Sequence, residues 1–289
     1  MRSELEQAVV LLRESDESSV RRALALLQSA VLSFGIKVCG HREDAEDTAQ
    51  EVLVRALPHL AKLENPRALS AWLYTAAKNR CWQDRRTARY RKTVALEQLL
   101  PGEGELSALL LADSSASPED EVLNRQDHRR LHQAVLALPP QYRIVLVLHD
   151  MEELDTDLVA KVLSLRPATV RVRLHRARLL VRQEMAKRLR HGTEPARRGK
   201  KTAARPPECR EIFASLSEYL DGRLAPVNCE QMRRHIEACP ACVAFMQDLK
   251  KAIDRCRALD VCPDREARPV LRRLLTQEYL RLKNSSENR

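Results

Sequence analysis

The chain has 289 residues, a length that predicts two or three compact domains. Its 50 lysine and arginine residues exceed its 40 aspartate and glutamate residues, and the resulting net charge of +10 favours an anionic partner. Aromatic residues amount to only 3% of the chain, which argues against a β-sandwich, so an all-α protein is expected.

The sequence predicts neither a membrane span nor a secretion signal. Its longest apolar runs, such as Ile144–Leu148, are far shorter than the ~18 residues of a transmembrane helix. The segment Met1–Gln7 is acidic after one arginine and lacks the basic and then apolar order of a signal peptide. A cytoplasmic protein is therefore expected. Its 8 cysteines should be mostly reduced, so a cluster of them indicates metal binding or redox sensing before structural disulfides.

Three or four helices are predicted in a first domain, residues 1–92. Apolar residues recur at spacings of three and four along residues 18–39, which are followed by a glycine suited to a helix cap. A second helix begins near Glu43, with carboxylates in its first turn, and stops near Pro58. A third opens at Pro66, because proline is favoured at the first helical position.

Two stretches without helical periodicity divide the rest of the chain. The first is rich in glycine, proline and serine, and its acids meet no base. The second is rich in proline and basic residues. The predicted divisions are an acidic linker at 93–118, a helical domain at 119–190, a basic flexible linker at 191–207 and a small helical domain at 208–289.

Residues 154–178 have the layout of a helix-turn-helix. Asp155 can cap a short first helix, and a turn leads to Pro167 near the start of the second. Between residues 161 and 190, ten basic residues meet a single acid, which favours nucleic-acid contact over the alternative of a solvated basic helix. Four arginines fall mostly on faces away from the apolar side, where they could reach phosphates or guanine edges in a major groove: Arg171, Arg173, Arg176 and Arg178.

The helix-turn-helix is preceded by Ala137–Arg143 and closes with Leu174–Arg178, while the acidic Asp44–Val52 and the aromatic Ser70–Arg80 lie upstream. The region around the helix-turn-helix resembles region 4 of the sigma-70 family, in its extracytoplasmic-function (ECF) group. The two upstream segments resemble region 2.2 and regions 2.3 and 2.4 of the same group. The resemblance covers about residues 5–185 in the family's order. It implies two helical domains, region 2 and region 4, with core RNA polymerase and promoter DNA as partners.

The resemblance also implies roles for individual residues. The acidic helix would bind the polymerase through Asp44, Glu46, Asp47, Gln50 and Glu51. Region 2 would hold the melted minus-ten strand through stacking and phosphate contacts made by Trp72, Asn79, Arg80, Trp82, Arg85, Arg86 and Arg89. Region 4 would read the minus-thirty-five duplex with Arg166, Thr169, Arg171, Arg173, His175 and Arg176.

Each of these assignments has a structural alternative. Trp72 and Tyr74 could equally belong to the core. Asp44, Glu46 and Asp47, at the start of the helix that begins near Glu43, could serve only as partners of the helix dipole. The chain also departs from the family pattern at Gln83, Leu158 and Val172. Promoter contacts are therefore expected to differ from the family norm, while the fold is expected to be retained.

The last domain contains a pattern typical of a zinc site. His235 and Cys239 lie one helical turn apart on one face, and Cys242 follows after a proline turn. A tetrahedral zinc ion needs a fourth ligand, for which Cys209 and Cys229 are the candidates. The segment resembles the zinc-finger family found in anti-sigma domains, and this resemblance favours Cys209. Buried reduced cysteines are the alternative interpretation.

These observations predict a sigma factor that directs promoter-specific transcription initiation and is autoregulated by its fused zinc-binding domain, whose last helices would cover the sigma domains. The alternative is a helix-turn-helix regulator that binds DNA without core polymerase. A second hypothesis is redox control through the zinc thiolates and the spare thiols Cys229, Cys256 and Cys262. No catalytic motif is found, so an enzyme is not expected.

Overall fold

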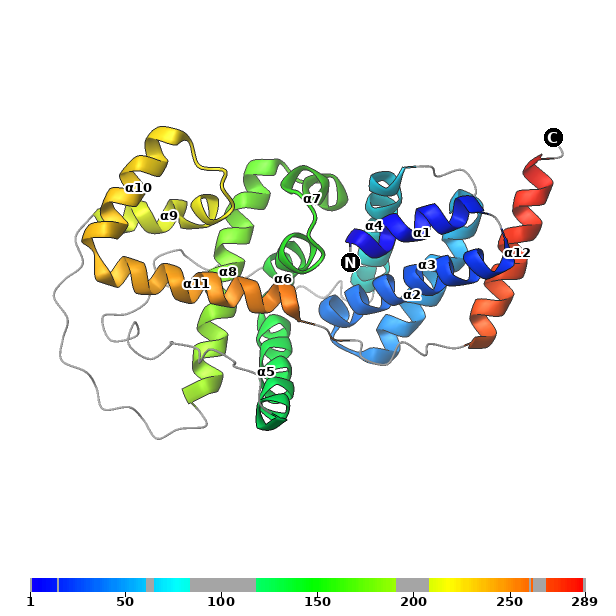
Figure 1. Ribbon diagram of the computed structural model, residues 1–289, viewed down its shortest axis with the longest axis horizontal. Coiled ribbons are helices and arrows are strands. Elements are labelled where there is room, and N and C mark those ends of the chain that lie inside the picture. Colours follow the sequence, from blue (N-terminus) through cyan, green and yellow to red (C-terminus); the bar gives the residue numbers. More distant parts are fainter. Residues whose placement is uncertain are drawn as a thin grey trace. The chain divides into compact units, whose positions relative to one another are not determined.

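The computed structural model describes residues 2–14, 16–60, 65–83, 118–190, 208–259, 261 and 269–287. The regular elements in these ranges are all helices, as the sequence predicts. They group into two compact units (Figure 1), which are described separately. The units do not follow the linear divisions expected from the sequence, because the first takes in residues 147–167 and the C-terminal helix. The linear domain boundaries stay a prediction.

The first unit is a bundle of helices closed by two later segments. Its members are α1 (Arg2–Glu14), α2 (Glu17–Cys39), α3 (Arg42–Leu60), α4 (Pro66–Gln83), a π-helical turn (Val147–Met151), α7 (Thr156–Leu163) and α12 (Pro269–Glu287). The Asp16 carboxylate accepts hydrogen bonds from the backbone N–H groups of Ser18 and Ser19, and so caps α2. The Ser19 side chain, and then these backbone bonds, lower the pKa of Asp16. Gly40 ends α2 in the left-handed conformation, with φ 82°, as its position in the sequence predicts.

Helix α2 is the centre of this unit. It contacts α1, α3, α4 and α12, and its Phe34 ring lies 5.0 Å from the Tyr74 ring of α4. A β-carbon added to Gly35 would stand 2.9 Å from the β-carbon of Ala45, so the crossing of α2 and α3 requires glycine here. By length and composition α2 could cross a membrane, with a mean hydropathy of 1.4 over 18 residues, but 78% of that window is buried inside the protein.

The second unit combines α5 (Pro118–Ala137), α6 (Pro140–Leu146), α8 (Pro167–Arg190), α9 (Glu208–Leu220), α10 (Pro226–Ala238) and α11 (Pro240–Ala258). Proline at the first position of most of these helices fixes where they begin. The Arg143 guanidinium donates hydrogen bonds to the carbonyls of Leu136 and Leu138, which end α5. We call α9, α10 and α11 the metal-binding module, after the metal ligands that the sequence predicts in it. Its core includes an edge-to-face pair of Phe213 and Phe245, with ring centroids 4.7 Å apart.

Candidate metal centre and nucleic-acid interface

Four side chains of the metal-binding module converge on one point. Cys209 comes from the first turn of α9, His235 from the last turn of α10, and Cys239 and Cys242 from the start of α11. One ligand atom from each residue lies within 4.8 Å of the others. The structure thus brings together the four ligands expected from the sequence.

The spacing of these atoms fits a tetrahedral metal ion. The Cys209 Sγ lies 3.5 Å from His235 Nε2 and 3.7 Å from Cys242 Sγ, and His235 Nε2 lies 3.3 Å from Cys242 Sγ. Bond lengths of ~2.3 Å for Zn–S and ~2.1 Å for Zn–N would separate neighbouring ligand atoms by about 3.5–3.8 Å. The rival ligand Cys229 instead directs its Sγ to the Leu224 carbonyl, at 3.3 Å, and is not part of the cluster.

Burial raises the pKa of Cys242, and the neighbouring thiols of Cys239 and Cys209 raise it further. Neutral thiols are the stable form of such a cluster without a cation, because adjacent thiolates repel one another in a poorly solvated site. A bound divalent metal would reverse this preference and hold the sulfurs as thiolates. The donor set of three sulfurs and one imidazole is one that soft or borderline metals prefer.

One face of α8 carries a stripe of polar residues that faces the metal-binding module: Arg171, His175, Arg178 and Arg182. Arg178 is fully buried, and its guanidinium forms a two-pronged ion pair with Asp221, at 2.8 and 3.0 Å. Arg182 pairs with Asp248 of α11 at 3.1 Å and lies over the Phe245 ring, 4.3 Å from its centroid. Burial raises the pKa of Asp248, although its pairing with Arg182 opposes that shift.

The same stripe continues toward the start of α8. Arg171 lies 3.3 Å from the Glu218 carboxylate, and His175 Nδ1 shares a 2.8 Å hydrogen bond with the Ser217 hydroxyl. The Arg171 and Glu218 side chains are each about two-fifths exposed, so this outer pair lies in water whereas the Arg178 pair does not. In the second unit, carboxylates of the metal-binding module therefore pair with Arg171, Arg178 and Arg182 along one face of α8.

Acidification should loosen the contact at His175. Burial, and then the positive charges of Arg178 and Arg176, lower the pKa of His175 to about 4. The unfolded chain binds a proton near pH 6.5 while the folded chain does not, so stability falls as the pH drops from about 6.5 toward 4. We expect the unfolding free energy to be lower at pH 5 than at pH 7 by ~2 kcal/mol from this group.

Urea unfolding followed by far-UV circular dichroism measures this difference. The variant His175→Gln supplies the control, because it keeps a polar side chain without a titrating ring. An equal drop in stability for both proteins would contradict the assignment of the effect to His175.

The sequence-predicted DNA contacts of region 4 differ in accessibility. Arg166 and Arg171 are exposed, and Thr169, Arg173 and Arg176 are half-buried. His175 is only 7% exposed and faces Ser217 rather than solvent. The expectation that Arg178 lies on an accessible face is wrong, because it is buried against the metal-binding module. The interval of four, three and four residues between 171, 175, 178 and 182 marks one helix face, and was the signal that could have revealed this stripe.

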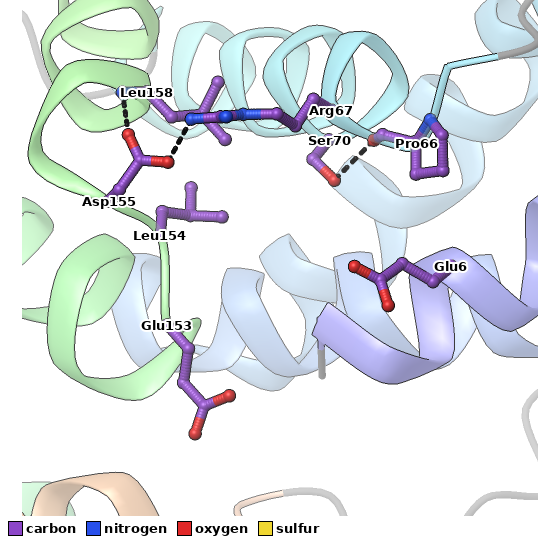
Figure 2. Close-up of a pocket in the computed structure, with 8 residues that line it drawn as sticks. All are labelled: Glu6, Pro66, Arg67, Ser70, Glu153, Leu154, Asp155 and Leu158. Atoms are coloured by element: carbon purple, nitrogen blue, oxygen red, sulfur yellow. Dashed lines mark hydrogen bonds and ion pairs between the residues drawn. The ribbon is translucent and has the colours of Figure 1, made fainter.

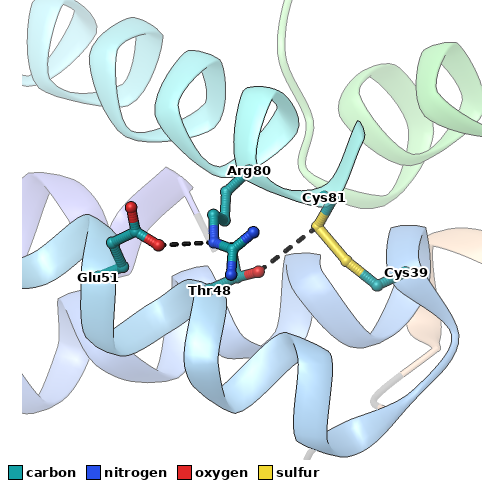
Figure 3. The surroundings of a disulfide bond; sticks show 5 residues. All are labelled: Cys39, Thr48, Glu51, Arg80 and Cys81. Atoms are coloured by element: carbon teal, nitrogen blue, oxygen red, sulfur yellow. Dashed lines mark hydrogen bonds and ion pairs between the residues drawn. A yellow bond between two sulfur atoms is a disulfide. The ribbon is translucent and has the colours of Figure 1, made fainter. Parts of the chain in front are cut away.

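The expected polymerase contacts lie on α3. Asp44, Asp47 and Gln50 are exposed, while Glu46 is half-buried and pairs with Arg42 at 2.9 Å. Glu51 is half-buried and contacts Arg80 of α4 at 2.5 Å (Figure 3), so a predicted polymerase contact and a predicted DNA contact bind each other.

The remaining predicted DNA contacts of region 2 lie on or beyond α4. Asn79 is exposed, and the half-buried Trp72 ring lies 5.3 Å from the His59 ring. Tyr74 belongs to the core, at 2% exposure. Trp82 lies on α4, but its side chain is outside the described residues, as are Arg85, Arg86 and Arg89.

Cys39 and Cys81 form a disulfide in the first unit, where reduced thiols were expected. The bond joins the end of α2 to α4, whose α-carbons approach to 5.7 Å at these residues (Figure 3). The two cysteines are 42 residues apart, and no local pattern in the sequence indicates that they meet. The described cysteines Cys209, Cys229, Cys239, Cys242 and Cys256 form no disulfide.

Reduction of this disulfide should destabilise the first unit. The bridge closes a long loop, and removing such a constraint costs about 2–4 kcal/mol of unfolding free energy. Both tryptophans of the chain lie on α4, so urea unfolding followed by tryptophan fluorescence reports on this unit. Cys39→Ser should unfold like the reduced wild type and should not respond to reductant. Identical curves for oxidised and reduced wild type, with thiol titration showing that reduction occurred, would contradict the prediction.

Comparisons with known proteins agree with this architecture. The family models that match are "Sigma-70 region 2" over residues 23–91, "Sigma-70, region 4" over residues 128–181 and "Putative zinc-finger" over residues 209–242. Together they cover most of α2, all of α3 and α4, the helix-turn-helix, and α9, α10 and the start of α11.

Similar proteins are themselves described as sigma factors. The chain is 32% identical over 168 residues to the probable RNA polymerase sigma factor RfaY of Xanthomonas campestris, a match covering 58% of this chain and 40% of RfaY. It is 31% identical over 178 residues to the ECF RNA polymerase sigma factor SigL of Mycobacterium tuberculosis, covering 58% of this chain and 92% of SigL. It is 25% identical over 182 residues to the ECF RNA polymerase sigma factor SigW of Bacillus subtilis, a match covering 63% of this chain and 96% of SigW.

A region 2 bundle together with a region 4 helix-turn-helix defines a class of transcription initiation proteins, the sigma factors, which are not enzymes. The chain belongs to the ECF group of RNA polymerase sigma factors, with a zinc-finger domain at its C-terminal end. The family implies core RNA polymerase and promoter DNA as partners. The matches support a sigma factor over the alternative of a helix-turn-helix regulator that binds DNA without core polymerase.

Proposed function

We propose that this chain is an autoregulated sigma factor, in which a zinc-loaded module binds α8 and restrains region 4 from contacting promoter DNA. The observation that carries the proposal is the pairing of α8 arginines with carboxylates of the module. A carboxylate at the end of a short side chain satisfies a guanidinium much as a phosphate oxygen would. The module and DNA therefore compete for the same charges.

Zinc is the metal that fits best. Three thiolates and one imidazole fill a tetrahedral shell, which leaves no open position for chemistry and indicates a structural role. The spacings of 3.3–3.7 Å among Cys209, His235 and Cys242 support this choice. The metal would hold α9 against α10 and α11, and thereby fix Asp221 and Asp248 opposite α8.

The C-terminal helix bears on which sigma region is restrained. α12 packs on α2 and α3 through the buried Leu275, Thr276 and Tyr279, so it covers part of region 2. The acids Asp44 and Asp47 stay exposed. We therefore assign the restraint to region 4 and its DNA contacts, while Asp44 and Asp47 stay accessible to the polymerase.

The test is reconstituted transcription with purified core polymerase. The whole chain should be less active on its promoter than a chain ending at His191, and a zinc chelator should raise the activity of the whole chain only. Co-migration with core polymerase checks sigma function itself. Equal activity of both chains, with and without chelator, would refute autoregulation but leave sigma function intact.

A further inference from the structure

An ion pair lies buried between region 2 and the segment that precedes α7. The Lys37 ammonium of α2 lies 3.0 Å from the Glu152 carboxylate, and the two side chains are 3% and 0% exposed. The Tyr74 hydroxyl of α4 donates a 2.8 Å hydrogen bond to the other Glu152 oxygen. Burial and the Glu152 charge raise the pKa of Tyr74, so its hydroxyl keeps its proton. We call Lys37, Tyr74 and Glu152 the latch.

Two further contacts hold the same segment on region 2. The Lys78 ammonium donates a 2.8 Å hydrogen bond to the Val162 carbonyl, near the negative end of the α7 dipole. Arg67 pairs with Asp155, which also caps the start of α7 by accepting a hydrogen bond from the Leu158 N–H (Figure 2). Both ends of α7 are therefore held by basic side chains of α4.

The latch residues belong to different sigma regions. Lys37 and Tyr74 lie within the region 2 match, and Glu152 lies within the region 4 match. α7 is the first helix of the helix-turn-helix, and only residues 164–166 separate it from α8. Wherever α8 binds DNA, α7 must follow.

The latch is incompatible with simultaneous reading of both promoter elements. Sites at minus ten and minus thirty-five are about 25 base pairs apart, which at ~3.4 Å per base pair is about 85 Å of duplex. A 3.0 Å ion pair between Lys37 and Glu152 cannot persist when region 2 occupies one site and α8 the other. This step rests on the proposed reading of the two elements by regions 2 and 4.

We propose that the surface of region 2 made by Lys37, Arg67, Tyr74 and Lys78 is a binding site for residues 152–162 of the same chain. It holds the helix-turn-helix on region 2 until the promoter separates them. Removing one member of a buried ion pair leaves the other charge without compensation, so the loss of either Lys37 or Glu152 should weaken the whole latch. This restraint lies within the sigma regions and adds to the one exerted by the metal-binding module.

The test is a distance measurement in the full chain. Fluorophores are attached through azide-bearing residues placed at Val54 of α3 and Asp157 of α7, both exposed. The wild type should show a short distance that lengthens with core polymerase and promoter DNA. Lys37→Met replaces the ammonium by an apolar side chain of similar length and leaves the buried Glu152 carboxylate without its positive partner. The population of molecules with the short distance should therefore fall at least about tenfold without DNA. Lys37→Met/Glu152→Met should restore it, because a well-packed apolar pair can replace a buried ion pair.

Tyr74→Phe guards against misfolding of the lysine variant. It keeps the ring against Phe34 and removes only the hydroxyl, so the distance should lengthen in a smaller fraction of molecules. An unchanged distance in folded Lys37→Met and Tyr74→Phe would overturn the proposal. A different result would refute autoregulation by the metal-binding module. In that case transcription would not change on chelation, while the distance between residues 54 and 157 would still respond to the latch variants.

Discussion

Replacing Asp221 by asparagine should free α8 from the metal-binding module and raise the affinity of the chain for promoter DNA. Arg178 is fully buried against Asp221, and removing one partner of a buried pair costs about 3–5 kcal/mol because the remaining charge lies in a poorly solvated site. The simplest relief is separation of the module, which returns Arg178 to water. Limited proteolysis of α9 and titration of a labelled promoter fragment measure the two consequences.

A matched control is available on the same face of α8. Glu218→Gln removes the partner of Arg171 in a pair whose members are each about two-fifths exposed. Exposed pairs contribute about 0–1 kcal/mol, so this variant should remain close to wild type in both measurements. If Asp221→Asn bound DNA and resisted protease as the wild type does, the buried pair would not be what holds the module on α8.

The second large effect should come from Cys242→Ser, which removes one ligand of the proposed zinc site. Structural zinc contributes about 10–16 kcal/mol to the folding of finger peptides, far more than a small helical module gains from its core. We expect loss of bound metal and of helix content in the module. Elemental analysis gives the metal stoichiometry, and circular dichroism gives the helix content.

Cys229→Ser is the corresponding control. Its thiol contacts the Leu224 carbonyl and not the cluster, so this variant should retain one metal per chain and the wild-type spectrum. Retention of a full equivalent of metal by Cys242→Ser would show that the ligand set is different. A loss in both variants would point to Cys229 as a ligand.

The sequence predicted the helices well because their signals are local. The glycine after residues 18–39 and the proline at position 66 mark helix ends through backbone preferences that act within one turn. The clustering of His235, Cys239 and Cys242 was predicted for the same reason, since their spacing places them on neighbouring turns. Cys209 required the family resemblance, because it is separated from the others by a whole helix and a turn.

The interactions that were missed are the long-range ones. Lys37 lies in an apolar helix and Glu152 in an acidic stretch, 115 residues apart, and neither segment indicates its partner. The periodicity of a helix shows which face is buried but not what covers it. For that reason Arg178 was expected to reach DNA, although the module buries it.

The stripe on α8 contains a side chain with two expected partners, promoter DNA and the metal-binding module. Arg171 is both an expected reader of the promoter and the partner of Glu218. A substitution that changes the preferred DNA sequence at this position also removes the partner of Glu218, but because both side chains are exposed the module loses at most about 1 kcal/mol of binding free energy. Target genes could therefore diversify through Arg171 while the buried Arg178–Asp221 pair keeps the module on α8, so Arg171 should vary more than Arg178 when related chains are aligned.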